Sequence, residues 1–308
     1  MRTTFVKTLL AIAKRDPRIM LLTGDLGFTV FEEFRDTLGR QYLNAGVAEQ
    51  NMVGVAAGLA LSGRRVFVYS IVPFVTFRCF EHIRNDVCYH NLPVCIVGVG
   101  GGYSYGHMGS THHALEDIAV MRSLPNMKVL CPGDPLETEA LVHAIVEQDG
   151  PCYLRLGKAG EPTLHMEPLS LTIGRAIEMR SGQDLTLIAS GTMLERALEI
   201  ADRLQGGFVR ASVLSMHTVK PLDVEAVRKA AAATPLLVTL EEHSRIGGLG
   251  SAVAEALSLE GLAVRHLLCA APDGFATYAG SQEYLRACAG LTVPSICKRI
   301  EEVCRVPA

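Results

Sequence analysis

The sequence predicts an α/β protein made of two consecutive domains, each a mostly parallel sheet flanked by helices. Two observations predict this class. Short apolar runs of strand length alternate along the 308 residues with stretches of helical length, a pattern typical of parallel sheets covered by helices. The alternation stops in a stretch rich in glycine and proline, residues 157–174, and then restarts. We therefore place a boundary near residue 165 and expect domains over residues 1–165 and 166–308.

The elements of the first domain follow from the spacing of apolar residues. Phe5, Leu9 and Ile12 recur at helical spacing, so the domain should begin with a helix over residues 4–15. The later elements are expected as a strand over 18–25, a helix over 47–62, a strand over 64–72, a helix over 76–90, a strand over 92–100, a glycine-rich loop, a helix over 114–124 and a strand over 127–133. Because parallel sheets bind ligands beyond the carboxyl ends of their strands, the loops over 24–29, 70–78 and 100–113 should wall a site.

The second domain repeats the alternation. Its expected elements are a strand over 184–191, a helix over 192–204, a strand over 209–216, a helix over 222–233, a strand over 235–242 and a helix over 248–257. The last helix follows the segment "EEHSRIGG", whose glycines permit close packing of strand and helix. We assign this segment no chemistry.

Composition argues against several classes of function. The net charge of -3, with no run of lysine or arginine, disfavours nucleic acid as a partner. No apolar stretch reaches the ~20 residues of a membrane span and no secretory signal is recognisable, so a cytoplasmic protein with no membrane partner is expected. The nine cysteines form no C-x-x-C pair, which favours reduced thiols. Hydrophobic residues make up 49% of the chain, which suggests a large surface buried against another chain.

One acid stands out in the apolar segment "NAGVAEQNMVGVAAGLALSG", residues 44–63. Glu49 lies near the start of the expected helix, among Val47, Ala48, Met52 and Val53. Desolvation by these neighbours would favour the protonated carboxyl group, which could then exchange a proton near neutral pH. A capping role at the helix start fits the spacing equally well.

Aromatic side chains follow the second predicted strand of the site. Phe74, Phe77 and Phe80 recur every three residues, with Arg78 among them. Three rings along one side of a helix or turn could sandwich a flat heterocycle, although a place in the hydrophobic core is the commoner use of such spacing.

The glycine-rich loop carries three histidines, His107, His112 and His113, just before a helix. No cysteine or further histidine joins them at ligand spacing, so a zinc site is weakly supported. Proton transfer or hydrogen bonding to a substrate fits a loop between strand and helix better. The glycines do not match G-x-G-x-x-G, so a dinucleotide site is not supported.

Five segments taken together resemble the C-terminal half of transketolase. They are residues 44–63, "FVTFRCFEHIR" at 74–84, "GSTHHALEDIAVMRSLPNMKVLCPGDPLETEAL" at 109–141, "MHTVKPLD" at 216–223 and "EEHSRIGGLGSAVAEAL" at 241–257. They follow the family's order, and the match extends over nearly the whole chain. The resemblance implies a pyrimidine-binding domain followed by a transketolase C-terminal domain.

The resemblance implies thiamin diphosphate as the cofactor. Glu49 stands at the family's glutamate, which hydrogen-bonds the pyrimidine ring and promotes the imino form whose nitrogen deprotonates the thiazolium carbon. Asp25, in "TGDLG", would lie beside the cofactor. The residues implied to flank or support the pyrimidine are Phe74, Phe77, Arg78 and Phe80.

The resemblance also implies a phosphorylated substrate. His112 matches the family's substrate-contacting histidine, and His107 and His113 would join it in the substrate loop. Met108 stands where transketolases commonly have an aspartate that contacts a donor hydroxyl, so this site should discriminate less for that hydroxyl or favour a donor without one. The residues implied to bind the substrate's phosphate are Arg2, Thr29 and Arg155.

The family's G-D-G motif with its downstream asparagine is missing from the sequence. In the family this motif belongs to the domain that holds the diphosphate and its magnesium or calcium ion. We therefore expect no metal ligand in this chain. The expected partner is an N-terminal subunit that carries the diphosphate domain, in an α2β2 heterotetramer whose like chains also self-associate through a dimer interface.

Three functions remain open at this stage. The first is the C-terminal subunit of a split transketolase that transfers a two-carbon ketol unit from a ketose phosphate to an aldose sugar. The second is a related thiamin-dependent enzyme that uses a 2-oxo acid such as pyruvate, which Met108 motivates. The third is a non-catalytic scaffold subunit, against which Glu49 argues, because a scaffold has no need of an acid in an apolar segment.

Overall fold

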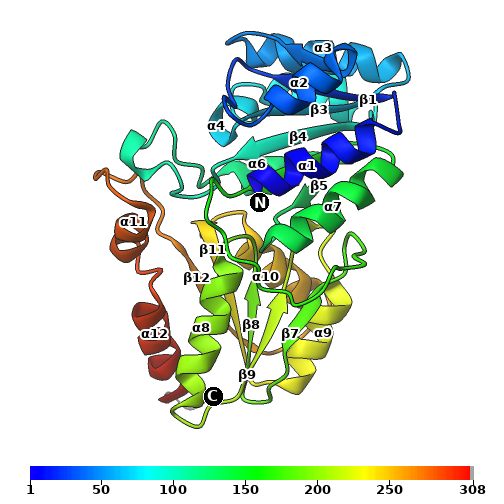
Figure 1. The fold of residues 1–308 in the computed structure, drawn as a ribbon. Helices are drawn as coiled ribbons and strands as arrows, with labels where there is room; N and C mark the ends of the chain where they lie inside the picture. Colours follow the sequence, from blue (N-terminus) through cyan, green and yellow to red (C-terminus); the bar gives the residue numbers. More distant parts are fainter. Residues whose placement is uncertain (306–308) are drawn as a thin grey trace.

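The computed structural model describes residues 1–305 as two α/β units, one stacked on the other (Figure 1). The first unit is built on a seven-stranded sheet of order β10-β5-β6-β4-β3-β1-β2. Every pairing in this sheet is parallel except that of β10 with β5. Its strands are β1 Ile19–Thr23, β2 Tyr42–Asn44, β3 Arg65–Ile71, β4 Val94–Val99, β5 Lys128–Leu130, β6 Cys152–Leu156 and β10 Thr218–Lys220.

Helices bury both faces of the first sheet. The helices of this unit are α1 Arg2–Ala13, α2 Glu32–Thr37, α3 Glu49–Leu61, α4 Val72–Val75, α5 Phe80–His82, α6 Asp117–Ser123 and α7 Pro135–Glu147. On β3, Val66 and Val68 pack towards α3 and α6, whereas Phe67 and Tyr69 pack towards α1 and α7. Because successive side chains of a strand point to opposite faces, a strand buried on both sides is apolar throughout.

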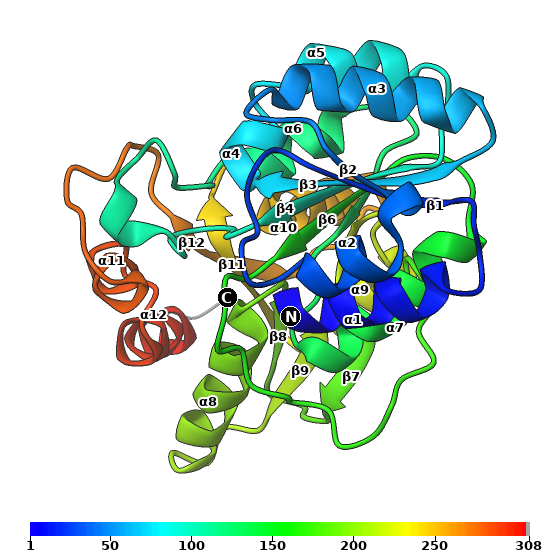
Figure 2. The ribbon, with the colours of Figure 1, turned by 45° about the horizontal axis from the view of Figure 1, so that its top comes forward.

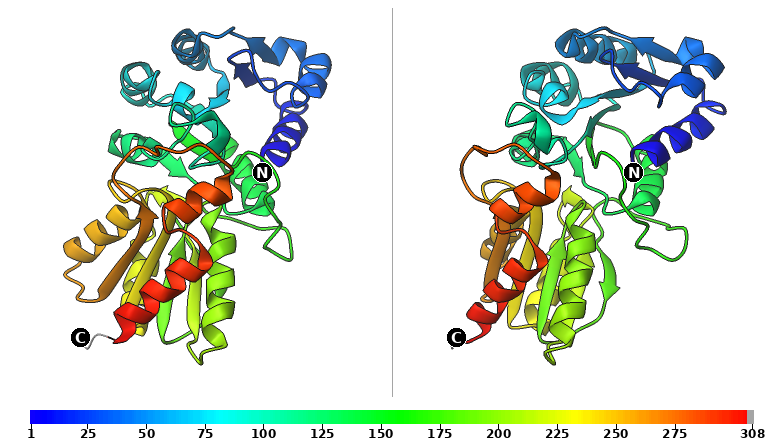
Figure 3. Two further views of the ribbon diagram at one scale, coloured as in Figure 1. Left: turned by 90° about the vertical axis from the view of Figure 1, so that its left-hand side faces the viewer. Right: turned by 60° about the vertical axis from the view of Figure 1, so that its left-hand side comes forward.

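The second unit has a five-stranded sheet of order β12-β11-β8-β9-β7, parallel except for the edge strand β7. Its strands are β7 Ile177–Arg180, β8 Leu185–Ala189, β9 Ala211–Ser215, β11 Leu236–Ser244 and β12 Arg265–Ala271. Its helices are α8 Met193–Gln205, α9 Val224–Ala233, α10 Leu249–Leu259, α11 Gln282–Cys288 and α12 Val293–Arg305. Helices α8 and α12 pack on one face, and α9 and α10 pack on the other. The red and orange C-terminal segment runs along one side of this unit and meets the first unit through an orange loop (Figure 3).

The predicted fold class is confirmed, although the sequence analysis placed no element at α2, α7, α11, α12, β2, β6, β7, β10 or β12. Two of the predicted helices also differ locally. Over residues 76–90, where one helix was expected, the chain forms a turn, α5 and a π-helical segment, Ile83–Cys88, and the short α4 precedes them. Pro73 starts the short α4, and the Thr76 hydroxyl donates back to the Val72 carbonyl at 2.7 Å where α4 ends. The second difference is that α6 begins at Asp117, three residues later than expected.

Residues 157–176 contain no helix or strand and connect β6 to β7. The division at residue 165 stays a prediction, because β10 returns from the second half of the chain to the first sheet. Among residues 1–305, every helix is too short or too polar to cross a lipid bilayer.

Candidate active site

Three loops converge beyond the carboxyl ends of β1, β3 and β4, where the sequence predicted the site walls. They follow β1 at Thr23, β3 at Ile71 and β4 at Val99. Figure 2 shows α4 and the loop after β4 on the same side of the first sheet. This edge collects most of the predicted site residues.

Glu49 is the first residue of α3 and is only 1% exposed. Its Oε1 accepts a hydrogen bond from the Ser70 hydroxyl at 3.2 Å, and its Oε2 accepts one from Arg78 Nη1 at 2.7 Å. The chain passes close by at Gly24, where a Cβ atom would lie 3.3 Å from Glu49 Cγ. The expected apolar surroundings are found only in part: Met52 and Val53 are buried, but Val47 is 76% exposed, and a hydroxyl and a guanidinium reach the carboxylate.

The aromatic residues do not form a single stripe. The Phe74 ring lies 4.8 Å from the Arg78 guanidinium carbon and meets His112 edge to face at 5.1 Å. Phe77 is half-buried, and Phe80 packs against the hydrophobic core of the first unit. The break after α4 separates the rings, so Phe74 is the one that the structure brings beside Glu49, Arg78 and His112.

The loop after β4 presents His112 to this cluster. His112 is half-buried, and its Nδ1 lies 3.0 Å from the Thr111 hydroxyl. His113 is buried instead, with Nε2 3.3 Å from the Gly106 carbonyl. His107 and Met108 belong to an exposed 3-10 turn, Gly106–Met108, and Met108 is 59% exposed. Of the residues predicted in this loop, only His112 contacts Phe74.

Arg2, Asp25 and Thr29 lie at the rim of the same edge. Arg2 begins α1, and within the described residues its Nε has no hydrogen-bond partner. Burial raises the pKa of Tyr105, and the nearby positive charge of Arg2 opposes that rise. Asp25 and Thr29 are exposed and have positive φ angles of 54° and 65°. Such strained backbone is common in functional loops and fits a binding role.

Arg155 corrects the prediction of a phosphate ligand. It is buried on β6, where its Nε donates to Asp117 at 2.7 Å and its Nη2 donates to the carbonyls of Ala114 and Glu242 at 2.9 and 3.0 Å. Burial alone would raise the pKa of Asp117, but the Arg155 charge lowers it below its ordinary value. Arg155 therefore joins the two units and does not face the open edge.

Lys158 is a candidate that the sequence pattern missed. It is exposed three residues after Arg155, and its Nζ lies 4.8 Å from the ring centroid of Tyr105. The Tyr105 ring lies 6.2 Å from that of His112. Lys158 lies two residues beyond the carboxyl end of β6, a strand that the sequence analysis did not place, so recognising that strand would have pointed to this residue.

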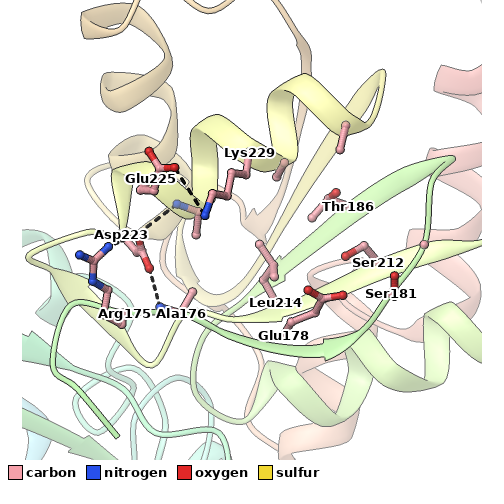
Figure 4. Close-up of a pocket in the computed structure, with 14 residues that line it drawn as sticks. Arg175, Ala176, Glu178, Ser181, Thr186, Ser212, Leu214, Asp223, Glu225 and Lys229 are labelled. Atoms are coloured by element: carbon pink, nitrogen blue, oxygen red, sulfur yellow. Dashed lines mark hydrogen bonds and ion pairs between the residues drawn. The ribbon is translucent and has the colours of Figure 1, made fainter.

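A cavity of about 540 Å³ lies elsewhere, between β7, β9 and α9 (Figure 4). Four of its five charged residues form pairs: Arg175 lies 3.6 Å from Asp223, and Lys229 lies 3.5 Å from Glu225, while Glu178 completes the charged lining. No predicted site residue lines it. Over residues 1–305, no three His, Cys, Asp or Glu side chains come together as a ligand set for a metal ion.

Two family models match the chain. The model for the pyrimidine-binding domain of transketolase matches residues 1–160, and the model for the transketolase C-terminal domain matches residues 174–296. A solved structure described as "Split gene transketolase, inactive beta4 tetramer" is 36% identical, with a TM-score of 0.91 over 98% of this chain and 97% of its own.

Relatives of similar length are, by name, single subunits of transketolases. An apulose-4-phosphate transketolase subunit of Phocaeicola vulgatus is 40% identical over 96% of this chain and 95% of its own length. A 6-deoxy-6-sulfo-D-fructose transketolase subunit of a Clostridium species is 38% identical over 98% and 94%. A longer relative, 1-deoxy-D-xylulose-5-phosphate synthase of Heliobacterium modesticaldum, is 35% identical over 97% of this chain and 46% of its own length.

Proposed function

The chain belongs to the transketolase family, and on that premise we propose that it is the C-terminal subunit of a two-chain transketolase. In this proposal the complex transfers a two-carbon ketol unit from a ketose phosphate to an aldose. The observation that supports it most is the convergence of Glu49, Phe74 and His112 at the carboxyl edge of the first sheet.

Membership of this family implies dependence on thiamin diphosphate, and the residues at the edge fit its pyrimidine ring. Glu49 offers a buried carboxylate whose Oε2 accepts a hydrogen bond from Arg78, a side chain that is 44% exposed. Phe74 and the half-buried Phe77 offer aromatic surface for a flat ring. We assign Glu49 and the two phenylalanines to the pyrimidine, with Asp25 beside it. When bound, the cofactor supplies a nucleophilic carbon that can cleave a carbon–carbon bond next to a carbonyl group.

The remaining residues act on the substrate in this proposal. The Nδ1 atom of His112 is held by Thr111, which leaves Nε2 for a donor hydroxyl or carbonyl. Arg2 and Lys158 both lie near Tyr105 and supply positive charge for a terminal phosphate. Lys158 thus takes the place that the sequence had suggested for Arg155.

We propose that a partner subunit completes the site. This chain lacks the G-D-G motif, so the diphosphate and its magnesium or calcium ion would be held by an N-terminal subunit in an α2β2 assembly. The solved relative described as an inactive beta4 tetramer supports the view that such chains self-associate without their partner and are then inactive.

The test is reconstitution from the two separate subunits. The chain would be mixed with a subunit that carries the diphosphate domain, thiamin diphosphate and magnesium, and assayed with a panel of ketose phosphates and an aldose acceptor. Turnover by the mixture and by neither subunit alone is the expected result. Lys158→Ala should raise KM for phosphorylated donors in that assay. The proposal fails if the mixture binds the cofactor but cleaves no ketose phosphate.

A 2-oxo acid donor is the second candidate. It is favoured by the relative that is a 1-deoxy-D-xylulose-5-phosphate synthase and by Met108 in place of the usual acid. Such a donor must lose carbon dioxide, whereas a ketose phosphate does not. Release of carbon dioxide from pyruvate by the reconstituted complex, without cleavage of any ketose phosphate, would establish this alternative.

A further inference from the structure

The carboxyl end of β11, in the second unit, lies against the loop that carries His112. Glu242 is at its centre and is buried. Its carboxylate accepts hydrogen bonds from the Tyr103 amide of the first unit at 2.8 Å, from Gln282 Nε2 at 3.0 Å and from Arg286 Nε at 3.1 Å. Arg286 forms an ion pair with Glu242. Because a buried charge without a partner is unfavourable, the cluster of Glu242, Gln282 and Arg286, called the hub below, is stable only while its charges and polar groups are paired.

Neighbours of Glu242 hold the far end of the same loop. The Ser244 amide donates to the Leu115 carbonyl at 2.7 Å, and the Ala119 amide donates to His243 Nε2 at 3.3 Å. The loop is therefore attached to β11 on both sides of His112, at Tyr103 before it and at Leu115 after it. The segment "EEHS", which sequence patterning left without a role, makes these attachments.

A second set of contacts comes from the loop between β12 and α11. Ser110 donates through its hydroxyl to the Ala276 carbonyl at 2.9 Å, and the Gly280 amide donates to the Gly106 carbonyl at 3.3 Å. A Cβ atom at Gly106 would collide with the Gly280 carbonyl, so the two backbones touch directly. Figure 1 shows the orange loop beside the loop that follows β4.

Gln282 joins these two sets of contacts. Its side-chain amide donates to both Glu242 oxygens at 3.0 Å and to the Ser104 hydroxyl at 3.3 Å. All of these bonds point to the loop or to its hub. The next residue, Glu283, pairs with Arg196 at 2.7 Å and lies 3.8 Å from Arg286, and within residues 1–305 no hydrogen bond links it to the loop over residues 103–113.

We propose that Glu242 and Gln282 are positioning residues, which hold the loop over residues 103–113 so that His112 meets the donor. The inference rests on the proposed function for the identity of the substrate, but the attachment itself does not. The first unit supplies the groups that contact cofactor and donor, and the second unit sets where the donor-contacting loop stands.

The experiment compares Gln282→Ala with Glu283→Ala in the reconstituted two-chain enzyme. Gln282→Ala should raise KM for the donor about tenfold, a change that corresponds to ~1.4 kcal/mol, while kcat, thiamin diphosphate affinity and Tm stay close to those of the wild type. Glu283→Ala removes the ion pair with Arg196 and the longer one with Arg286 but no contact with the loop, and Arg286 keeps its bonds to Glu242, so this variant should change none of these quantities.

Hydrogen exchange of the chain provides a readout that needs no substrate. Gln282→Ala should increase exchange over residues 103–113, and Ser104→Ala, which cuts the other end of the same hydrogen bond, should do likewise. Equal exchange over residues 103–113 in Gln282→Ala and Glu283→Ala would overturn the inference. A parallel fall in Tm, cofactor affinity and donor affinity in Gln282→Ala would also overturn it, because that result indicates a purely structural role. If Gln282→Ala increases exchange but the wild-type complex cleaves no ketose phosphate, the attachment of the loop to β11 is supported and the proposed function is rejected.

Discussion

Removal of Arg78 tests whether the buried Glu49 carboxylate depends on this one cation. Arg78 Nη1 lies 2.7 Å from Glu49 Oε2, and the remaining hydrogen bond to the carboxylate comes from Ser70 at 3.2 Å. Arg78→Ala would leave Glu49 buried with one neutral donor. A buried charge without its partner destabilises the folded state.

The expected loss lies between two limits. Breaking a fully buried pair by removing one partner costs about 3–5 kcal/mol, and an exposed pair contributes about 0.2–1 kcal/mol. The Glu49 side chain is 2% exposed but Arg78 is 44% exposed, so water can replace part of the guanidinium. We expect a loss of about 1–2 kcal/mol in the free energy of unfolding, or about 2–8 °C in the Tm of a domain of this size.

The assay is thermal and urea unfolding of the isolated chain, with Arg84→Ala as the matched control. Arg84 is exposed in the same segment and donates to Asn85 at 2.8 Å, so its removal should cost little. In a Glu49→Gln background no charge is left unpaired, so Arg78→Ala should cost less, about 0.5–1 kcal/mol from the contact with Phe74 together with any hydrogen bond to the amide oxygen. The same loss in both backgrounds would show that Glu49 does not depend on Arg78 and would refute the reasoning.

Three further predictions concern activity and pH. Glu49→Gln should lower kcat of the reconstituted enzyme by about 10²–10⁴-fold while assembly, measured by light scattering, is unchanged; normal turnover would remove this residue from the mechanism. Met108→Asp should raise the kcat/KM ratio of ketose phosphate to pyruvate about tenfold, and an unchanged ratio would show that this position does not select the donor. Burial would lower the pKa of His165, but its hydrogen bond to Asp134 at 3.0 Å and the charge of Glu137 raise it. A histidine whose pKa is higher in the folded than in the unfolded state stabilises the fold, fully so below about pH 6.5. Urea unfolding should therefore show a free energy of unfolding that falls as the pH rises through the raised pKa of His165. His165→Gln should make this fall smaller.

The parallel strands could be predicted because burial on both faces leaves its mark in each strand's own residues. In β3 and β4, every residue from Val66 to Tyr69 and from Val94 to Val99 is buried, so the sequence is apolar without alternation. Helix α7 carries an equally local signal that the apolar spacing alone does not show. Asp134 caps it by accepting from the Glu137 amide at 2.7 Å, and Pro135 takes its first position.

The candidate site was only partly predictable. Glu49 and His112 stand in segments whose order along the chain resembles a known family, and the structure places both at the expected edge. The ion pair between Glu49 and Arg78 was not foreseen, because 29 residues separate the partners and the break after α4 decides where Arg78 points.

Arg155 shows why a charged residue in a strand is ambiguous in sequence alone. A surface arginine that binds phosphate and a buried one that binds carboxylate both follow apolar residues at the carboxyl end of a strand. Here the partners that decide the matter, Asp117 and the Glu242 carbonyl, lie 38 and 87 residues away. The same separation hides the role of Glu242, whose contacts with Tyr103 span 139 residues. We therefore expect substitutions at Glu242 to shift the loop that carries His112, although Glu242 itself belongs to the second unit.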